Sequence, residues 1–254
     1  MHPILLKLGP LTLHTYGVAL TVALLVASWL AARRARAMPP ELAAMTPAQS
    51  ADFACLSLAG RIAGARLLYV LLEWDFFGRS PQEILALWHG GLVWYGGFLG
   101  GVLAGWLYAR AKRLAFWRVM DHWIPFLALG HAIGRFGCFF NGCCYGRPTS
   151  AWYGVVFPGQ AAPVVPTQLF EAAGLVVLYV ILRLLQRPSL LSRPGGLFGV
   201  YLISYGGLRF LLEFLRGDQT PWWAGLTLQQ LISVGASFAG WGLLRSAMQR
   251  RATP

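Results

Sequence analysis

The sequence has 254 residues, of which 57% are hydrophobic and only 12% are charged, and its mean hydropathy is +0.56. A soluble domain is usually about 25% charged. The charged residues of this sequence are too few to cover a water-exposed surface, and the composition therefore favours a membrane protein. The formal net charge of +12 would suggest a nucleic-acid partner for a soluble protein. We find no nucleic-acid-binding motif, so we attribute the excess to Lys and Arg on the cytoplasmic side of a membrane.

Seven segments are apolar enough to cross a bilayer as helices, which takes about 20 residues each. In chain order they are 12–32, 51–72, 91–109, 120–140, 166–184, 196–215 and 226–244. Every second connection is rich in basic residues, beginning with Arg33, Arg34 and Arg36. The positive-inside rule then places the N-terminus outside and the C-terminus in the cytoplasm. We therefore expect an all-α polytopic membrane protein with seven transmembrane helices, forming a single integral membrane domain over residues 1–254.

Ionisable residues inside the apolar segments are informative, because an arginine at mid-membrane costs about 2.5–3.5 kcal/mol on insertion scales and usually faces a cavity or a partner. His131 and Arg135 are four residues apart and therefore share one helix face. Arg209 and Glu213 have the same spacing. Two helices thus offer an arginine at similar depth, which favours an anionic ligand, and a phospholipid headgroup is the expected source of phosphate.

Structural roles are the alternative for several of these charges. Arg209 and Glu213 can form an ion pair within their helix, with Arg216 reaching the outer interface. Arg61 and Arg66 can pair with acidic residues, and for these two arginines we favour a structural role. The candidate partners are Asp52, Glu73 and Asp75.

The run HAIGRFGCFFNGCCYGRPT, residues 131–149, gathers polar and reactive groups at the outer end of the fourth segment. Its Gly-Arg at 134–135, Asn-Gly at 141–142 and Tyr-Gly-Arg at 145–147 resemble the signature of the prolipoprotein diacylglyceryl transferase family. Further strings resemble other segments of that family in the same order along the chain. They are LHTYGVAL, GARLLYVL, GGLVWYGGFLGG, PTQLFEAA and YGGLRFLLEFLR.

This resemblance implies a multi-pass enzyme of the bacterial inner membrane that moves a diacylglyceryl group from phosphatidylglycerol to the thiol of a lipobox cysteine in a secreted preprotein. Glycerol-1-phosphate is the by-product. We expect no cofactor and no metal, and the expected partners are phosphatidylglycerol, the preprotein and membrane lipids. Arg135 and Arg209 are the expected donors to the leaving phosphate ester. The substrate-binding positions implied by the match are Tyr16, Arg66, Gly96, Gly134, Asn141, Gly142, Gly146, Arg147, Glu171 and Arg216.

The sequence departs from the family pattern at three positions. Tyr95 occupies the place of a third-helix histidine that is often assigned the role of base, and Cys138 and Cys143 replace the signature asparagine and glutamate. We hypothesise that His131 takes over proton handling, with Tyr95 as a secondary donor. Glu213 is another candidate base, and the alternative for His131 is a hydrogen-bonded structural residue of the helix bundle.

The cysteines leave several chemistries open. Cys138, Cys143 and Cys144 are predicted on the outer side, where disulfides form, so a bridge from Cys138 to Cys143 or Cys144 is one prediction. Free thiols and a thiol-relay or lipid-carrying role are others. A bound metal is a further alternative because the thiols and His131 are close in sequence, although the C-x4-C-C spacing matches no standard zinc pattern. Cys55 is expected to be a buried small hydrophobe.

Three other functions compete with transfer to a lipobox thiol. The first is a transferase of the same fold with a different acceptor, which the replaced signature residues favour. The second is a membrane thiol oxidoreductase, which the lack of a C-x-x-C pair in the sequence disfavours. The third is a non-catalytic lipid-binding protein, since buried arginines alone also suit an anion pathway.

Overall fold

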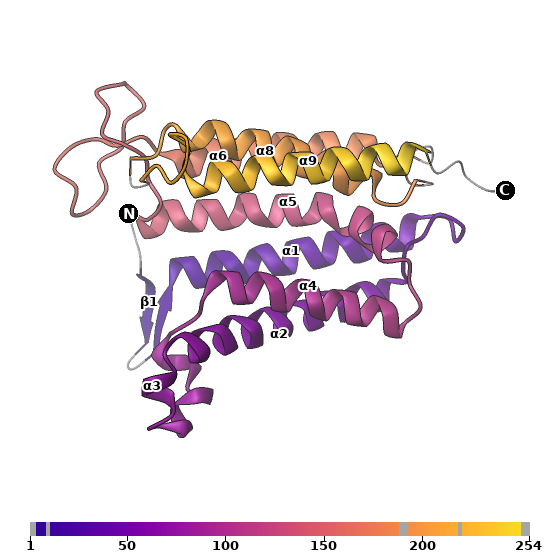
Figure 1. Ribbon diagram of the computed structural model, residues 1–254, viewed down its shortest axis with the longest axis horizontal. Helices are drawn as coiled ribbons and strands as arrows, with labels where there is room; N and C mark the ends of the chain where they lie inside the picture. Colours follow the sequence, from indigo (N-terminus) through magenta and orange to yellow (C-terminus); the bar gives the residue numbers. More distant parts are fainter. Residues whose placement is uncertain (1–3, 9–10, 188–190, 192, 218–219, 250–254) are drawn as a thin grey trace. The chain divides into compact units, whose positions relative to one another are not determined.

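The computed structural model describes residues 4–8, 11–187, 191, 193–217 and 220–249, and it is mainly helical (Figure 1). Each of the seven predicted segments coincides with a long helix. In chain order the elements are β1 (Ile4–Leu8), β2 (Leu11–His14), α1 (Thr15–Ala37), α2 (Pro47–Leu72), α3 (Trp74–Phe77), η1 (Pro81–Leu85), η2 (Leu87–His89), α4 (Trp94–Ala111), α5 (Phe116–Asn141), α6 (Thr167–Leu185), α8 (Gly196–Glu213) and α9 (Leu228–Gln249).

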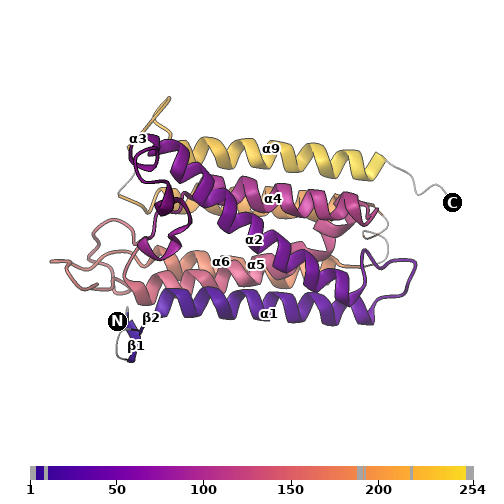
Figure 2. The same cartoon turned by 90° about the horizontal axis from the view of Figure 1, so that it is seen from below.

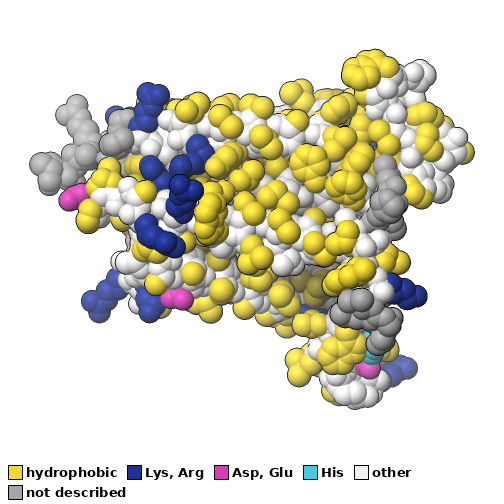
Figure 3. Space-filling model, turned by 180° about the vertical axis from the view of Figure 1, so that it is seen from behind, with side chains coloured by type: hydrophobic (Ala, Val, Ile, Leu, Met, Phe, Trp, Pro, Cys, Tyr) yellow, Lys and Arg dark blue, Asp and Glu magenta, His cyan; other side chains and the backbone are white. Residues whose placement is uncertain are grey.

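The surface of the helices is that of a membrane protein. Within the described residues, the four helices α1, α2, α5 and α6 have the length and hydropathy of a membrane span. Hydrophobic side chains cover much of the face drawn in Figure 3, as expected where helices contact lipid. The polytopic helical membrane class is thus confirmed, and the further spans expected at α4, α8 and α9 stay predictions.

The N-terminal segment differs from the all-α prediction. β1 and β2 pair antiparallel, with Ile4 opposite His14, and α1 begins only at Thr15 rather than at residue 12. The string LTLH alternates apolar and polar residues, which suits a strand. The Gly-Pro pair at 9–10 is typical of a turn in sequence terms. Hydropathy alone does not distinguish these periodicities, so the first helix was predicted to begin too early.

The described chain divides into two compact units, one formed by residues up to 31 and from 120 onward, the other by residues 32–119. In the second unit, α2 runs obliquely across α4 (Figure 2). Glycines make this contact: a Cβ added to Gly64 would clash with the carbonyl group of Gly96, and one added to Gly100 would clash with that of Gly60. Small residues allow membrane helices to approach this closely. The prediction of a single domain stays a prediction.

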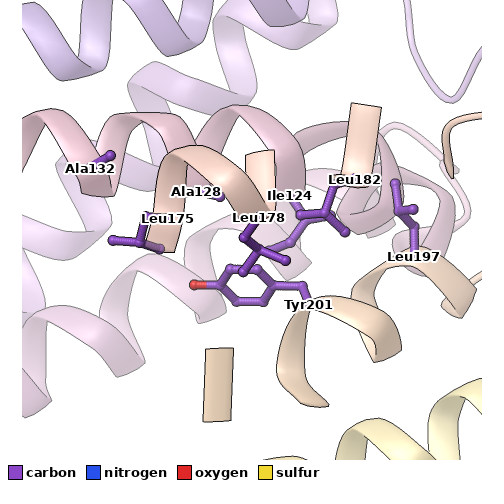
Figure 4. Close-up of a cluster of buried hydrophobic side chains, with 8 residues drawn as sticks. All are labelled: Ile124, Ala128, Ala132, Leu175, Leu178, Leu182, Leu197 and Tyr201. Carbon is purple, nitrogen blue, oxygen red and sulfur yellow. The ribbon is translucent and has the colours of Figure 1, made fainter. Parts of the chain in front are cut away.

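In the first unit, α8 and α9 lie side by side (Figure 1), and α5, α6 and α8 enclose an apolar core (Figure 4). The core side chains are Ile124, Ala128, Ala132, Leu175, Leu178, Leu182, Leu197 and Tyr201. The leucines of α6 recur every three or four residues and form one helix face. The same face continues to Gln168 and Glu171, which are 1% and 3% exposed. Packing of the apolar core therefore also fixes these two polar side chains inside the protein.

A buried carboxylate fixes the start of α8. Asp121 is 2% exposed, and its two oxygens accept hydrogen bonds from the backbone N–H groups of Gly195 (2.7 Å) and Phe198 (2.8 Å). Such N-terminal groups have no partner within their helix, and a negative charge beside them is favourable. Sequence reasoning missed Asp121 because it lies at the edge of an apolar segment, where a charge needs no special partner.

Candidate active site

Polar residues of three helices meet at Glu171, in the second turn of α6. Arg135 Nη2 lies 2.9 Å from Glu171 Oε1, and the hydroxyl of Tyr205 donates a 2.9 Å hydrogen bond to the same oxygen. His131 Nε2 lies 3.7 Å from that oxygen. The Glu171 side chain is only 4% exposed, and a buried charge of this kind is stable only when it is paired and hydrogen-bonded. We refer to His131, Arg135, Glu171 and Tyr205 as the Glu171 cluster.

Helix geometry and aromatic packing orient this cluster. His131 and Arg135 share one face of α5, as predicted, because residues four apart in a helix are neighbours. The ring of Tyr205 stacks on that of Tyr201 with centroids 5.6 Å apart, and the His131 ring meets Tyr205 edge-on at 5.3 Å. Because Tyr201 belongs to the apolar core, the orientation of His131 is set by packing as well as by charge.

Arg135 retains an unused donor. Its Nη2 binds Glu171, but its Nε is buried and has no hydrogen-bond partner among the described residues. The side chain is 17% exposed. Buried donors are normally satisfied, but this Nε is closed to any ligand, so an anion can reach Arg135 only through the exposed part of its guanidinium group.

Arg209 and Glu213 form the ion pair of the structural alternative, with Arg209 Nη1 2.7 Å from Glu213 Oε2. The other oxygen of Glu213 accepts a 2.9 Å hydrogen bond from the Thr227 hydroxyl. Thr227 also caps α9, because its hydroxyl accepts from the backbone N–H of Gln230 while the Gln230 side chain accepts from the Thr227 N–H. The pair therefore joins the end of α8 to the start of α9, in keeping with the structural alternative.

The loop after α5 is held by the first turn of α6. The Gln168 amide donates to the carbonyl of Cys143 (2.6 Å), and the Thr167 hydroxyl donates to the carbonyl of Cys144 (2.8 Å). Gly142 and Cys144 have left-handed backbones, with φ of +72° and +64°. A glycine adopts this conformation without strain, whereas a cysteine adopts it only where its surroundings impose it.

The signature residues Gly146 and Arg147 are fixed through their backbones. Gly146 donates to the carbonyl of Val165, Val165 donates to that of Arg147, and Arg147 donates to that of Leu215, at 2.8–3.0 Å. A Cβ on Gly146 would clash with the carbonyl oxygen of Leu215, so this position requires glycine. The Arg147 side chain is exposed and is therefore free of the packing that holds its backbone.

Three thiols meet at the end of α5. The Sγ atoms of Cys138, Cys143 and Cys144 all lie within 4.8 Å of one another, and we call these residues the thiol cluster. All four cysteines fall within the described residues and are free thiols, so the predicted disulfide is not formed in this structure. Cys55 is exposed on α2, and its predicted burial is wrong.

The two loop thiols differ in acidity. A hydrogen bond from Cys138, a second one from Cys143, and the charges of Arg135 and Arg216 lower the pKa of Cys144 to about 5, against the opposing effect of burial. Burial is the main cause of a raised pKa at Cys143. Near neutral pH, Cys144 is therefore expected to be a thiolate that lies beside neutral thiols.

Other predicted site residues of the first unit lie along α1 and α5. Tyr16 lies in the first turn of α1, where its ring would be 3.4 Å from a Cβ on Gly137. Gly134 lies within α5 opposite Leu20. Asn141 is the last residue of α5 and is exposed. Gly134 and Asn141 thus lie with Arg135 at the C-terminal end of α5, and Tyr16 of α1 packs near the same end.

Arg66, Tyr95 and Gly96 belong to the second unit. The guanidinium group of Arg66 donates to carbonyl oxygens of the segment 83–91, including those of Glu83 (2.5 Å) and Gly90 (2.6 Å). The predicted pairing of Arg66 with acidic side chains is therefore wrong; irregular backbone supplies the acceptors instead. Tyr95 is 47% exposed in the first turn of α4, and Gly96 is buried against α2.

The helices and the Glu171 cluster define a polytopic membrane protein with ionisable groups inside its helical part, a feature that usually marks function. The chain belongs to the prolipoprotein diacylglyceryl transferase family, whose family model matches residues 3–245. The phosphatidylglycerol–prolipoprotein diacylglyceryl transferase of Thermosynechococcus vestitus is 34% identical over 258 residues, covering 98% of this chain and 94% of that protein. The protein of the same name from Cupriavidus metallidurans is 38% identical over 221 residues, covering 84% and 80%. That from Synechococcus elongatus is 35% identical over 265 residues, covering 99% and 90%.

Proposed function

We propose that this protein transfers the diacylglyceryl group of phosphatidylglycerol to a cysteine thiol of a prolipoprotein and releases glycerol-1-phosphate. Membership of the family and the names of relatives from several bacteria support this reaction. The observation that carries it is Arg135, which is paired with buried Glu171 through one nitrogen and keeps its buried Nε unpaired among the described residues. The exposed part of this guanidinium group can donate to a phosphate while Glu171 holds the arginine in place.

In the proposed reaction the acceptor sulfur loses its proton and forms a bond to a glyceryl carbon. The bond between that carbon and the phosphate oxygen breaks, and its electron pair goes to the oxygen. Arg135 and Arg209 stabilise the growing charge. His131 accepts the thiol proton, and Glu171, 3.7 Å from its Nε2, stabilises the resulting imidazolium as a positioning residue.

The remaining residues of the family match are proposed to shape the lipid and peptide sites without taking part in bond changes. Tyr95 is a secondary proton donor, and Glu213 is the second candidate base. The proposed substrate contacts are Tyr16, Gly96, Gly134, Asn141, Gly142, Gly146, Arg147 and Arg216. Arg66 is proposed to act through the backbone of the segment 83–91 that it holds.

The proposed topology is seven spans in the bacterial inner membrane, with the N-terminus outside and the C-terminus in the cytoplasm. Its support is the agreement between the long helices and the alternation of basic connections along the sequence. In this topology the loop after α5 faces the outer side, where a secreted preprotein arrives carrying a lipobox cysteine. Reporter fusions after each helix test it, and a cytoplasmic signal from the 142–166 loop would contradict it.

The reaction is tested in a strain depleted of its own diacylglyceryl transferase. The protein is expected to restore growth and to add a diacylglyceryl mass to the cysteine of a model lipoprotein. Arg135→Lys is expected to abolish most of this modification, because lysine keeps the charge but lacks the fork geometry. Arg79→Gln, at an exposed arginine of the second unit, is the matched control. A well-expressed protein that leaves the lipoprotein unmodified would contradict the proposal.

A transferase with a different thiol acceptor is the second candidate, because cysteines replace two signature residues at Cys138 and Cys143. Vesicles containing phosphatidylglycerol distinguish the two functions. Release of glycerol-1-phosphate that depends on a small thiol and is not increased by a lipobox peptide would favour the second candidate.

A further inference from the structure

The thiol cluster has no part in the mechanism described above, although it holds three of the four cysteines of the chain. Its Sγ atoms lie within 4.8 Å of one another, and the thiols are free. Cys138 follows Arg135 by three residues, so the cluster begins one helical turn from the proposed phosphate site and on the same face of α5.

The loop is built so that these thiols converge. The N–H and the thiol of Cys143 both donate to the carbonyl of Cys138, at 3.1 and 3.6 Å. Cys144 has its left-handed backbone at φ +64°, a conformation that costs an L-residue about 1–2 kcal/mol. Thr167 and Gln168 hold the carbonyls of Cys144 and Cys143. Strain imposed by its surroundings is concentrated at functional sites.

The spacing of the sulfur atoms fits a metal ion. Two thiolates on one tetrahedral zinc, with Zn–S bonds of about 2.3 Å, lie about 3.8 Å apart. The three Sγ atoms, within 4.8 Å of one another, reach this spacing by side-chain rotations that move each sulfur by less than about 1 Å. Thiolates are ligands that select zinc over harder divalent cations. Standard zinc sequence patterns describe closed sites with four ligands, which is why the C-x4-C-C spacing does not match one.

Three ligands leave one coordination position open. Cys138 is buried at 8% exposure, while Cys143 and Cys144 are half-buried in the loop, so the cluster is closed toward the helices and accessible from the loop. Catalytic zinc sites likewise have three protein ligands and a fourth position for water or substrate.

Nearby cations offset part of the charge that such a site would carry. A Zn²⁺ ion bound by the three cysteine thiolates and by the thiolate of an acceptor has a net charge of −2. The guanidinium groups of Arg135 and Arg216 both act electrostatically on Cys144. Because Glu171 already balances Arg135, these two groups offset only part of the charge of such a complex.

We propose that Cys138, Cys143 and Cys144 bind one Zn²⁺ ion, and that the acceptor cysteine of the prolipoprotein occupies its fourth coordination position as a thiolate. This inference rests on the proposed function, and it favours the metal alternative over the sequence-based preference for no metal. The acceptor proton passes through water to His131, which lies two helical turns before Cys138 on α5. The zinc-bound sulfur then forms the carbon–sulfur bond while the carbon–oxygen bond breaks toward the phosphate at Arg135. The product thioether is a weak zinc ligand and leaves, and zinc keeps its charge throughout.

The metal site is tested with zinc alone on the full-length protein in detergent. We expect one zinc per chain after dialysis in the unaltered protein and in Cys55→Ser, whose thiol is exposed on α2. Cys138→Ser, Cys143→Ser and Cys144→Ser are each expected to lose most of the zinc. Equal zinc content in a variant that lacks all three thiols would overturn the site.

Because a serine at the end of α5 can disturb folding, a second measurement uses the unaltered protein. Cobalt(II) in place of zinc gives thiolate-to-metal charge-transfer absorption and visible bands that report its coordination. A lipobox peptide is expected to shift the visible bands, while the same peptide with serine for cysteine leaves them unchanged. Identical spectra with both peptides would overturn coordination of the acceptor.

Turnover separates this inference from the proposed function. Chelator-treated protein is expected to transfer at least about tenfold more slowly and to recover when equimolar zinc is added. Equal turnover with and without zinc would overturn the role of zinc and leave diacylglyceryl transfer intact. No transfer by either form, in a preparation that binds zinc through the three cysteines, would overturn the proposed function and, with it, the catalytic role of the ion.

Discussion

Glu171 Oε1 lies 2.9 Å from Arg135 Nη2, so a buried carboxylate of α6 fixes the arginine of α5 that we propose binds phosphate. The hydroxyl of Tyr205 donates a hydrogen bond to the same oxygen. The charge of Arg135 is therefore already balanced before lipid binds. A phosphate is expected to bind beside this pair through the remaining nitrogens, without displacing Glu171.

Glu171→Gln tests this relationship, because it keeps the size of the side chain and removes its charge. The free energy of unfolding is expected to fall by about 3–5 kcal/mol, since Arg135 becomes an unpaired buried cation. Tyr205→Phe removes only one hydrogen bond to the same oxygen and is expected to cost about 1 kcal/mol. Thermal unfolding in detergent measures both, and equal losses would contradict the central role of the ion pair.

His131→Gln tests proton handling. Glutamine can still form hydrogen bonds near Glu171, but it cannot take up a proton, so turnover is expected to fall by about 10²–10⁴-fold. The unfolding temperature is expected to change little. Tyr95→Phe, at the proposed secondary donor, is expected to lower turnover less. Transferase turnover that is unchanged in His131→Gln would assign the proton to another group.

Asp121→Ala tests the buried cap of α8. It leaves the N–H groups of Gly195 and Phe198 without the carboxylate, and each unsatisfied buried donor costs about 1–3 kcal/mol. Unfolding is expected at a clearly lower temperature, with normal turnover at a permissive temperature because Asp121 is outside the Glu171 cluster. Thr46→Ala, at the exposed capping box of α2, is the control and is expected to cost about 1 kcal/mol. A smaller loss in Asp121→Ala than in the control would contradict the prediction.

The acidity of Cys144 predicts how alkylation depends on pH in zinc-free protein. With a pKa lowered to about 5, the Cys144 thiol is already a thiolate above that pH, and it is protonated below it. Its alkylation rate is therefore expected to be level above about pH 6, whereas an ordinary cysteine continues to gain reactivity toward pH 8.5. Peptide mapping measures the alkylation rate of each cysteine. Cys144→Ser is expected to remove the alkylation that is already fast at low pH. A rate at Cys144 that keeps rising through pH 8–9 would contradict the prediction.

The long helices could be predicted because a bilayer demands about 20 apolar residues whatever the tertiary packing. Their ends could not be predicted in this way. α2 begins at Pro47 under a capping box formed by Thr46 and Gln49, before the predicted start at residue 51. The N-terminal hairpin was missed for a related reason, because its strands use the same apolar residues as a helix and differ only in period.

Within the candidate site, local geometry was predictable and tertiary partners were not. The shared face of His131 and Arg135 follows from helix periodicity alone. Their common partner Glu171 depends on how α5 packs against α6, and nothing local to its sequence indicates it. The partners of Arg66 are carbonyl oxygens of irregular backbone, which side-chain charges do not reveal. The convergence of the thiols depends on the left-handed backbone of Cys144, which sequence rules assign to glycine first.

The contacts of Arg66 also bear on how an irregular segment can lie among lipids. A helix satisfies its own carbonyl groups, but the segment 83–91 lacks that internal ladder over part of its length, and one guanidinium group supplies donors for it instead. Leu85 and Trp88 on this segment are both 80% exposed. They can therefore enter the headgroup region while the carbonyl groups beneath them stay hydrogen-bonded. In effect, a single cation of α2 replaces the hydration that a surface loop would otherwise take from bulk water.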